Sequence, residues 1–196
     1  ERIRRREARL DRLQDEIVDY IEKISQRNLT ESQSKLIPGL IHAVNDAERV
    51  GDRCVDILKL LRRIHKRQLA FTPEAQTDLI TLFEGVEEMY QLVLQRLESD
   101  GPRTLDRIHG IYKKIGIMVK DMRKAHLARL EENSCELRSG VVFLELITHL
   151  SQLAQLLNQI VAFHAETSQT LPGQRNPHTE IDKDNEEEEE TVGATS

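Results

Sequence analysis

Apolar residues recur along this chain at intervals of three and four, which is the period of an amphipathic helix. The spacing predicts five helices, which end near residues 25, 68, 99, 132 and 165. The apolar stripe of each helix is expected to face the core, and it includes Leu13 and Ile17 in the first helix and Ala47 and Cys54 in the second. Thr30 and Ser32 are candidate N-caps for the second helix, and Thr72 followed by Pro73 is typical of a helix start. No segment alternates apolar and polar residues as a half-buried strand does. The sequence therefore predicts an all-α fold.

The periodic pattern ends after about residue 166. Residues 167–196 contain Pro172, Gly173 and Pro177, then an unbroken glutamate run, Glu186 to Glu190, with almost no apolar residues. Low hydrophobicity and a block of like charges are typical of disordered segments. We therefore expect a helical domain over residues 1–166 and a disordered acidic tail over residues 167–196.

Composition narrows the functional classes. Aromatic residues make up 4% of the 196 residues, which fits long helices better than a sheet protein, and the formal net charge of −6 argues against nucleic-acid binding. Cys54 and Cys135 both fall in helical patterns and do not resemble a disulfide framework, so a reducing compartment is expected, with Cys54 as a small core residue. No apolar run approaches the roughly 20 residues that a membrane-spanning helix needs.

Residues 45–57 place acids inside a helical pattern. Glu48, Asp52 and Asp56 lie four apart and fall on one side of a helix, where like charges repel. A bound cation would relieve this repulsion, and so would ion pairs with arginines close in the sequence: Arg12, Arg49 and Arg53. Gly51 lowers helix stability by about 1 kcal/mol relative to alanine, which close packing of a neighbouring helix would offset.

A weak internal repeat suggests two related helical units. Leu10-Asp11-Arg12-Leu13 is similar to Leu105-Asp106-Arg107-Ile108, and residues 44–57 align without gaps with residues 147–160. The two units are expected to span about residues 1–99 and 100–166.

The stretch Asp46-Ala47-Glu48-Arg49-Val50-Gly51-Asp52 resembles the signature of the PhoU family of phosphate-uptake regulators. The resemblance implies a fold of two similar three-helix bundles. It also implies that Glu48 and Asp52 bind metal ions, with Asp11 and Asp15 as acidic partners on the preceding helix. Such an oxygen-only site suits a divalent or trivalent ion such as Mg²⁺, Ca²⁺, Mn²⁺ or iron. The second unit departs from the pattern, since Ser151 and Gln155 align with Glu48 and Asp52.

The order of elements is similar to the C-terminal cytoplasmic domain of bacterial sodium/phosphate cotransporter-family proteins. This resemblance implies a non-catalytic regulatory domain on the cytoplasmic side of the inner membrane. Its expected partners are a membrane transporter domain of the same chain and a second copy in a homodimer, and not nucleic acid. The chain begins at Glu1 inside a charged helical pattern, so we expect part of the first bundle to lie upstream. The basic residues near that end suit the cytoplasmic side of a membrane segment: Arg2, Arg4, Arg5, Arg6 and Arg9.

Two other functions remain open from the sequence. A free-standing PhoU-type adaptor would bind transporter and sensor-kinase proteins, and its basic N-terminal residues would simply be solvated. A carboxylate-bridged metal enzyme is disfavoured because the paired Glu-x-x-His pattern of di-iron bundles is absent from the sequence. The scattered histidines, His126 among them, are expected at the surface or at the border of the core.

Overall fold

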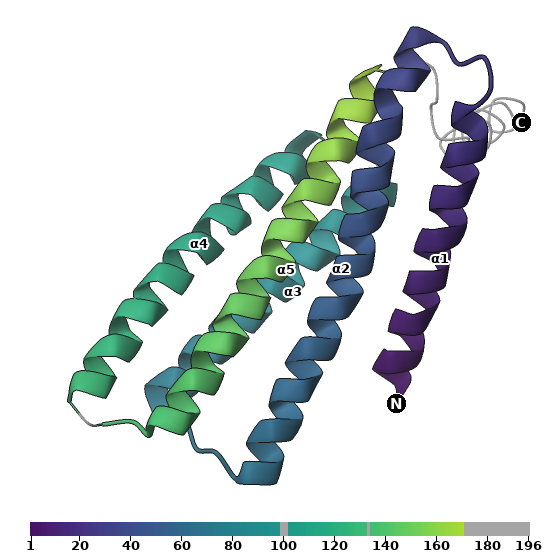
Figure 1. Cartoon of the computed structure of the whole chain (residues 1–196). Helices are drawn as coiled ribbons and strands as arrows, with labels where there is room; N and C mark the ends of the chain where they lie inside the picture. The colour runs from purple at the N-terminus through teal and green to yellow at the C-terminus, as the bar shows by residue number, and fades with distance from the viewer. Residues whose placement is uncertain (99–101, 133, 171–196) are drawn as a thin grey trace, which may run out of the picture.

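The computed structural model describes residues 1–98, 102–132 and 134–170, and these residues form five long helices (Figure 1). The helices are α1 (Arg2–Ser25), α2 (Glu31–Arg67), α3 (Pro73–Glu98), α4 (Pro102–Glu131) and α5 (Leu137–Thr170). No strand occurs in these ranges, which confirms the predicted all-α fold.

The N-termini of α2 and α3 are capped by threonine side chains at the positions where the sequence predicts helix starts. Thr30 Oγ1 accepts a hydrogen bond from the Gln33 backbone N–H at 3.3 Å, and Gln33 Oε1 accepts one from the Thr30 backbone N–H at 3.0 Å. This capping box satisfies two backbone donors that no helical partner could reach. Thr72 Oγ1 accepts from the Ala75 N–H at 3.3 Å and begins α3 in the same way. Of the two candidate caps for α2, Thr30 is therefore the one used.

Helices α3, α4 and α5 pack on one another as a three-helix bundle. Its core is built from side chains with almost no exposure to solvent, including Leu82, Met89, Ile108, Phe143 and Ile147. Helix α2 packs along α5, and Val50 and Ile57 extend the core toward it. Since α5 contacts α2, α3 and α4, it is the central helix of the molecule.

Helix α5 is also the most apolar helix of the described chain. Contrary to the expectation from the sequence, residues Leu137–Thr167 are long and apolar enough by composition to cross a membrane, with a mean hydropathy of 1.4 in the relevant window. More than half of that window, 56%, is buried inside the bundle. A central helix of a water-exposed bundle has the same composition, because it is covered by apolar neighbours on several sides.

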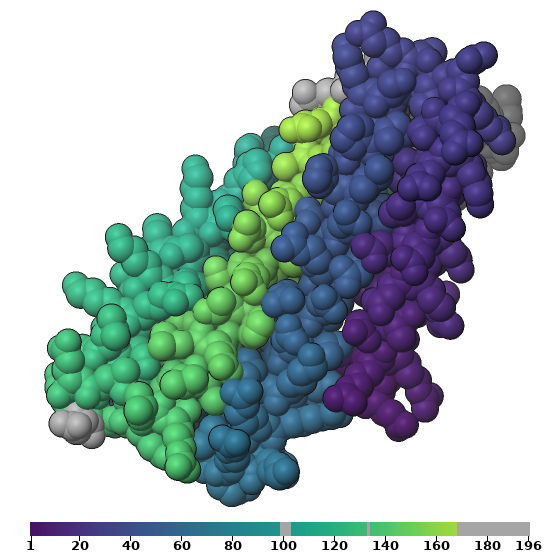
Figure 2. Space-filling model, in the orientation of Figure 1, coloured from purple at the N-terminus to yellow at the C-terminus, as the bar shows by residue number. Residues whose placement is uncertain are grey.

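Helix α1 lies at the edge of the molecule and, among the described residues, packs against α2 alone (Figures 1 and 2). Ile21 is its one buried residue, while Leu13 and Ile17 of its predicted apolar stripe are 41% and 40% exposed. The predicted stripe therefore marks the inner side of α1 without a neighbour that covers all of it.

The buried side of α2 differs from the predicted one. Ala47 and Cys54 were expected in its apolar arc, yet both are exposed. The residues buried in α2 are Gly51, Val55 and Leu60. The physical reason is that α2 has two neighbours: Gly51 lies against α1, whereas Leu60 packs with residues of α5. Two contact surfaces on different sides of one helix replace the single arc.

The structure bears on two boundaries that were expected from the sequence, the limits of the first unit and the start of the tail. Helix α3 was grouped with residues 1–99. Within the described residues its backbone lies close to those of α4 and α5 and not to those of α1 or α2, although Leu79 packs against the apolar cluster that includes Leu60 of α2. Helix α5 continues to Thr170, so the first four residues of the expected tail are helical. The remainder of that tail, residues 171–196, lies outside the described residues.

Candidate functional site

The acidic residues of the predicted site are brought together by close contact between α1 and α2. Gln14 Nε2 of α1 donates a hydrogen bond to Asn45 Oδ1 of α2 at 2.9 Å. Leu10 lies over Gly51, where an added Cβ would be 2.8 Å from Leu10 Cδ1. The expectation that Gly51 permits close helix packing is thus confirmed. These two contacts set which residues of α1 face the signature residues of α2.

Three of the four predicted acids interact at this interface. The pKa of Glu48 is raised, first by burial, then by the negative charges of Asp52 and Asp11 and by a side-chain hydrogen bond with Asp52. Asp11 Oδ1 is buried and has no hydrogen-bond partner among the described residues. The positive charge of Arg49 lowers the pKa of Glu48 only in part. A carboxylate oxygen without a donor, beside a carboxyl group with a raised pKa, indicates that too little positive charge lies here to compensate these acids.

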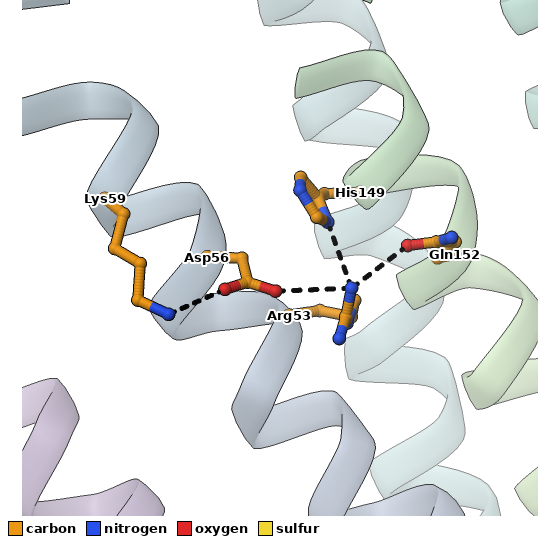
Figure 3. A network of polar contacts seen from close by, with 5 residues as sticks. All are labelled: Arg53, Asp56, Lys59, His149 and Gln152. Carbon is orange, nitrogen blue, oxygen red and sulfur yellow. Dashed lines mark hydrogen bonds and ion pairs between the residues drawn. The ribbon is translucent and has the colours of Figure 1, made fainter. Parts of the chain in front are cut away.

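Asp15, the fourth acid of the predicted site, and Asp56, the third acid of the i, i+4 series on α2, lie apart from this group. Asp15, the fourth predicted residue, is exposed and is not among the charges that shift the pKa of Glu48. Asp56 was expected to share a side with Glu48 and Asp52, but it bonds elsewhere. Its carboxylate accepts from Lys59 at 2.9 Å and pairs with Arg53 at 3.2 Å (Figure 3). These contacts, led by the hydrogen bond from Lys59, lower the pKa of Asp56.

Arg53, which directly follows the signature, faces the other neighbour of α2. Arg53 Nη1 lies 3.4 Å from His149 Nδ1 and 3.5 Å from Gln152 Oε1, both on α5 (Figure 3). Arg49 pairs with Asp46 at 3.7 Å along α2. The ion pairs offered as the alternative to a metal site therefore serve Asp46 and Asp56. The acidic pair of the signature faces α1, while Arg53 faces α5.

The carboxylates fit a cation by chemistry and only in part by arrangement. Glu48, Asp52 and Asp11 supply oxygen ligands alone, as hard cations prefer, and the buried Asp11 oxygen is free to accept a bond. As the side chains lie, no group of three or more His, Cys, Asp or Glu residues within residues 1–98, 102–132 and 134–170 could hold a metal ion. Binding would therefore require new side-chain rotamers at Glu48 or Asp11.

Sequence reasoning missed a second polar group, at the end of the bundle where α4 stops. His126 was expected at the surface or the core border, but it is only 2% exposed, and so is Ser139 of α5. The spacing could have predicted the burial of His126, because His126 follows the buried residues Ile115 and Met122 at helical intervals. Arg129 follows one turn later and lies over the Phe143 ring, 5.5 Å from its centroid.

Comparison with known proteins adds one finding, and it falls on the helices that carry the acidic site. No curated protein and no solved structure matches the chain. Residues 1–61 match the family model described as PhoU domain. The match spans α1 and most of α2, with Asp11, Glu48 and Asp52 inside it. Together with the all-α bundle, the match supports a PhoU-like domain in this chain, and PhoU domains are regulatory helical domains.

Proposed function

We propose that this chain is a regulatory domain for phosphate uptake that is attached to a sodium-dependent phosphate transporter on the cytoplasmic side of the membrane. The observation that carries the proposal is the coincidence of the PhoU domain match with the acidic interface between α1 and α2. The family match supports a phosphate-related regulatory role. The transporter attachment rests on the order of elements and on the exposed arginines at the start of α1.

We further propose that the interface binds a divalent or trivalent cation, Mg²⁺, Ca²⁺, Mn²⁺ or iron. Glu48, Asp52 and Asp11 would hold it, and Asp15 would contribute from the exposed side of α1. The bound ion would supply positive charge where burial and neighbouring carboxylates now raise the pKa of Glu48. Because α1 packs against α2 alone among the described residues, such a charge would strengthen the one interface that holds α1 in place.

Regulation would then act through the attachment of α1. A ligand shifts a conformational equilibrium only when it binds the two states with different affinities. An ion held between Asp11 of α1 and Glu48 and Asp52 of α2 meets this condition, because separating the helices would remove one of its ligands. The state of α1 would thereby report ion binding to a transporter domain next to it.

Metal content tests the site directly. Purified protein is loaded with each metal, dialysed and analysed by mass spectrometry for protein-bound metal. The double substitution Glu48→Ala with Asp52→Ala should lose the bound ion. The matched control is Glu84→Ala with Glu88→Ala, which removes two exposed acids at the same spacing from α3. Full metal content in the first double variant would contradict the proposed site.

Cell fractionation tests the attachment. The native protein in cells, detected with an antibody to this domain, should stay in the membrane pellet through high-salt and alkaline washes. Recovery in the soluble fraction would contradict the transporter proposal and favour a free-standing PhoU-type adaptor instead.

A further inference from the structure

A cavity of about 260 Å³ lies at the end of the bundle where α3 and α5 begin and α4 ends. This end of the three helices is the lower one in Figure 1. Thr72 and Phe71 border it before and at the start of α3, and His126 and Arg129 border it from the last turns of α4. Ser139 borders it from the first turn of α5. The cavity thus draws polar groups from three helices and uses none of the residues of the acidic interface.

Several of these polar groups are buried without a hydrogen-bond partner among the described residues: His126 Nε2, Ser139 Oγ, and Arg129 Nε and Nη2. His126 and Ser139 are each only 2% exposed. A buried polar group without a partner destabilises a fold, because it has lost its hydrogen bonds to water and gained none. Native proteins rarely keep several such groups together unless a water or an ion satisfies them.

The charge around the cavity favours an anion over water alone. The N-terminus of α5 lies here, and the N–H groups of a helix start that have no acceptor within the helix carry partial positive charge. The first backbone hydrogen bond at the start of α5 runs from the Gly140 N–H to the Glu136 carbonyl at 2.9 Å. Ser139 therefore lies in the first turn of α5, where the backbone N–H groups have no acceptor within the helix. Arg129 adds a full positive charge that is largely shielded from solvent, with 13% of its side chain exposed.

Acidic groups at this end compensate the positive charge only partly. Asp78 of α3 is the ion-pair partner of Arg129, at 3.7 Å, which is too long for a hydrogen bond. Glu74 is exposed on the first turn of α3, and Glu136 is exposed at the rim of the cavity. None of these carboxylates accepts a hydrogen bond from Arg129 Nε or Nη2, from Ser139 Oγ or from His126 Nε2 within the described residues.

We propose that this cavity binds a small oxyanion of the phosphate or sulfate class, held by Arg129, Ser139 and the N-terminus of α5, with His126 as a further donor. The guanidinium of Arg129 can only donate hydrogen bonds, and an oxyanion accepts hydrogen bonds in several directions at once. An oxyanion therefore complements the donors of this site. Gly140 makes room for the arrangement, since a Cβ there would lie 2.6 Å from Cε1 of the His126 ring.

The proposal does not rest on the function proposed above, and its test can fail separately. Inorganic phosphate is titrated into the full chain, and the heat of binding is measured by calorimetry. The buffer contains a chelator and has constant ionic strength, and acetate and chloride serve as comparison anions. The wild-type chain should bind phosphate more tightly than either of them. Ser139→Ala should weaken phosphate binding about tenfold, the effect of losing one hydrogen bond to a charged group.

Ser139→Ala separates binding from folding. Removing a buried hydroxyl that has no partner is neutral or stabilising in the absence of ligand, so this variant should fold. Arg129→Gln should weaken phosphate binding at least as much as Ser139→Ala does. Arg138→Gln is its matched control, because Arg138 is exposed on the same first turn of α5 and does not border the cavity. This control should bind phosphate as the wild-type chain does.

Three results would overturn the proposal. The first is an absence of phosphate binding to the wild-type chain, which would leave water as the occupant. The second is equal phosphate affinity in the wild-type chain and in Ser139→Ala, which would indicate a general salt effect of the kind that phosphate exerts on many proteins. The third is binding of acetate in preference to phosphate, which would indicate a carboxylate site.

Discussion

The α3–α5 bundle and the α1–α2 pair are built from similar amphipathic helices but bury their apolar residues to different degrees. In α3, six apolar residues are buried, whereas in α1 Ile21 alone is. The bundle surrounds its core on three sides, and α1 has α2 as its single neighbour among the described residues (Figure 2). The comparison indicates that most of the folding free energy lies in the bundle, while α1 is attached by one interface that a ligand could strengthen.

Truncation of a core side chain in each region should give the largest difference. Leu82→Ala removes a side chain with 0% exposure from the centre of the bundle and should lower the free energy of unfolding by about 2–5 kcal/mol. Leu13→Ala, at a side chain of α1 that is 41% exposed, should lower it by less than about 1 kcal/mol. Urea unfolding followed by circular dichroism measures both, and equal losses would contradict the comparison.

Hydrogen exchange should show the same contrast without any substitution. Backbone amides of α1 should exchange at least about tenfold faster than those in the middle of α5, because a helix with one contact surface opens without unfolding the bundle. Mass spectrometry after pepsin digestion resolves the two helices. If α1 and α5 were equally protected, α1 would belong to the same cooperative unit as the bundle.

Most of the fold could be predicted because its signals are local. Thr30 and Thr72 cap the helices that they were expected to start, and the apolar period gives five helices. The number of neighbours of each helix is not a local property. For this reason Ala47 and Cys54 were placed in a buried arc, while the structure exposes them beside two separate contact surfaces of α2.

In the candidate site, too, the local features could be predicted from the sequence and the features that depend on helix packing could not. The signature identified Glu48 and Asp52, and the preceding helix supplied Asp11, which the structure brings close to them. The i, i+4 spacing of Asp11 and Asp15 could not show that Asp15 points to solvent, since that depends on the rotation of α1 against α2. The burial of His126 depends in turn on Gly140, which is on another helix.

Substitution of Glu48 should change the free energy of unfolding by a smaller amount, and it tests the charge balance at the α1–α2 interface. Folding raises its pKa above the ordinary 4.5, so the folded state binds this proton more tightly and loses stability as pH rises through that raised value. Glu48→Gln should therefore increase the free energy of unfolding at pH 7 by about 0.5 kcal/mol, in the range of a relieved like-charge pair. Chemical unfolding with a chelator present, at pH 4 and pH 7, measures the change, which should be nearly absent at pH 4. Added metal should reverse its sign if the ion binds here.

Asp56, two turns further along α2, should show the opposite pH dependence and the smallest effect. Its pKa is lowered from 3.8, chiefly by the hydrogen bond from Lys59. Its contribution is therefore complete above pH 3.8 and is lost as pH falls through the lowered value. Asp56→Asn should reduce the free energy of unfolding at pH 7 by about 0.3 kcal/mol, because partly exposed pairs are screened by solvent.

The same unfolding series measures the Asp56 change, with Asp15→Asn as a control for the loss of an exposed acid from the neighbouring helix. The informative quantity is the difference in sign between Glu48→Gln and Asp56→Asn at pH 7. Opposite signs follow if the acids of one helix meet uncompensated negative charge on the α1 side and cations near α5. Two losses of equal size would mean that Glu48 is already compensated by positive charge, which would remove the physical reason for a cation between α1 and α2.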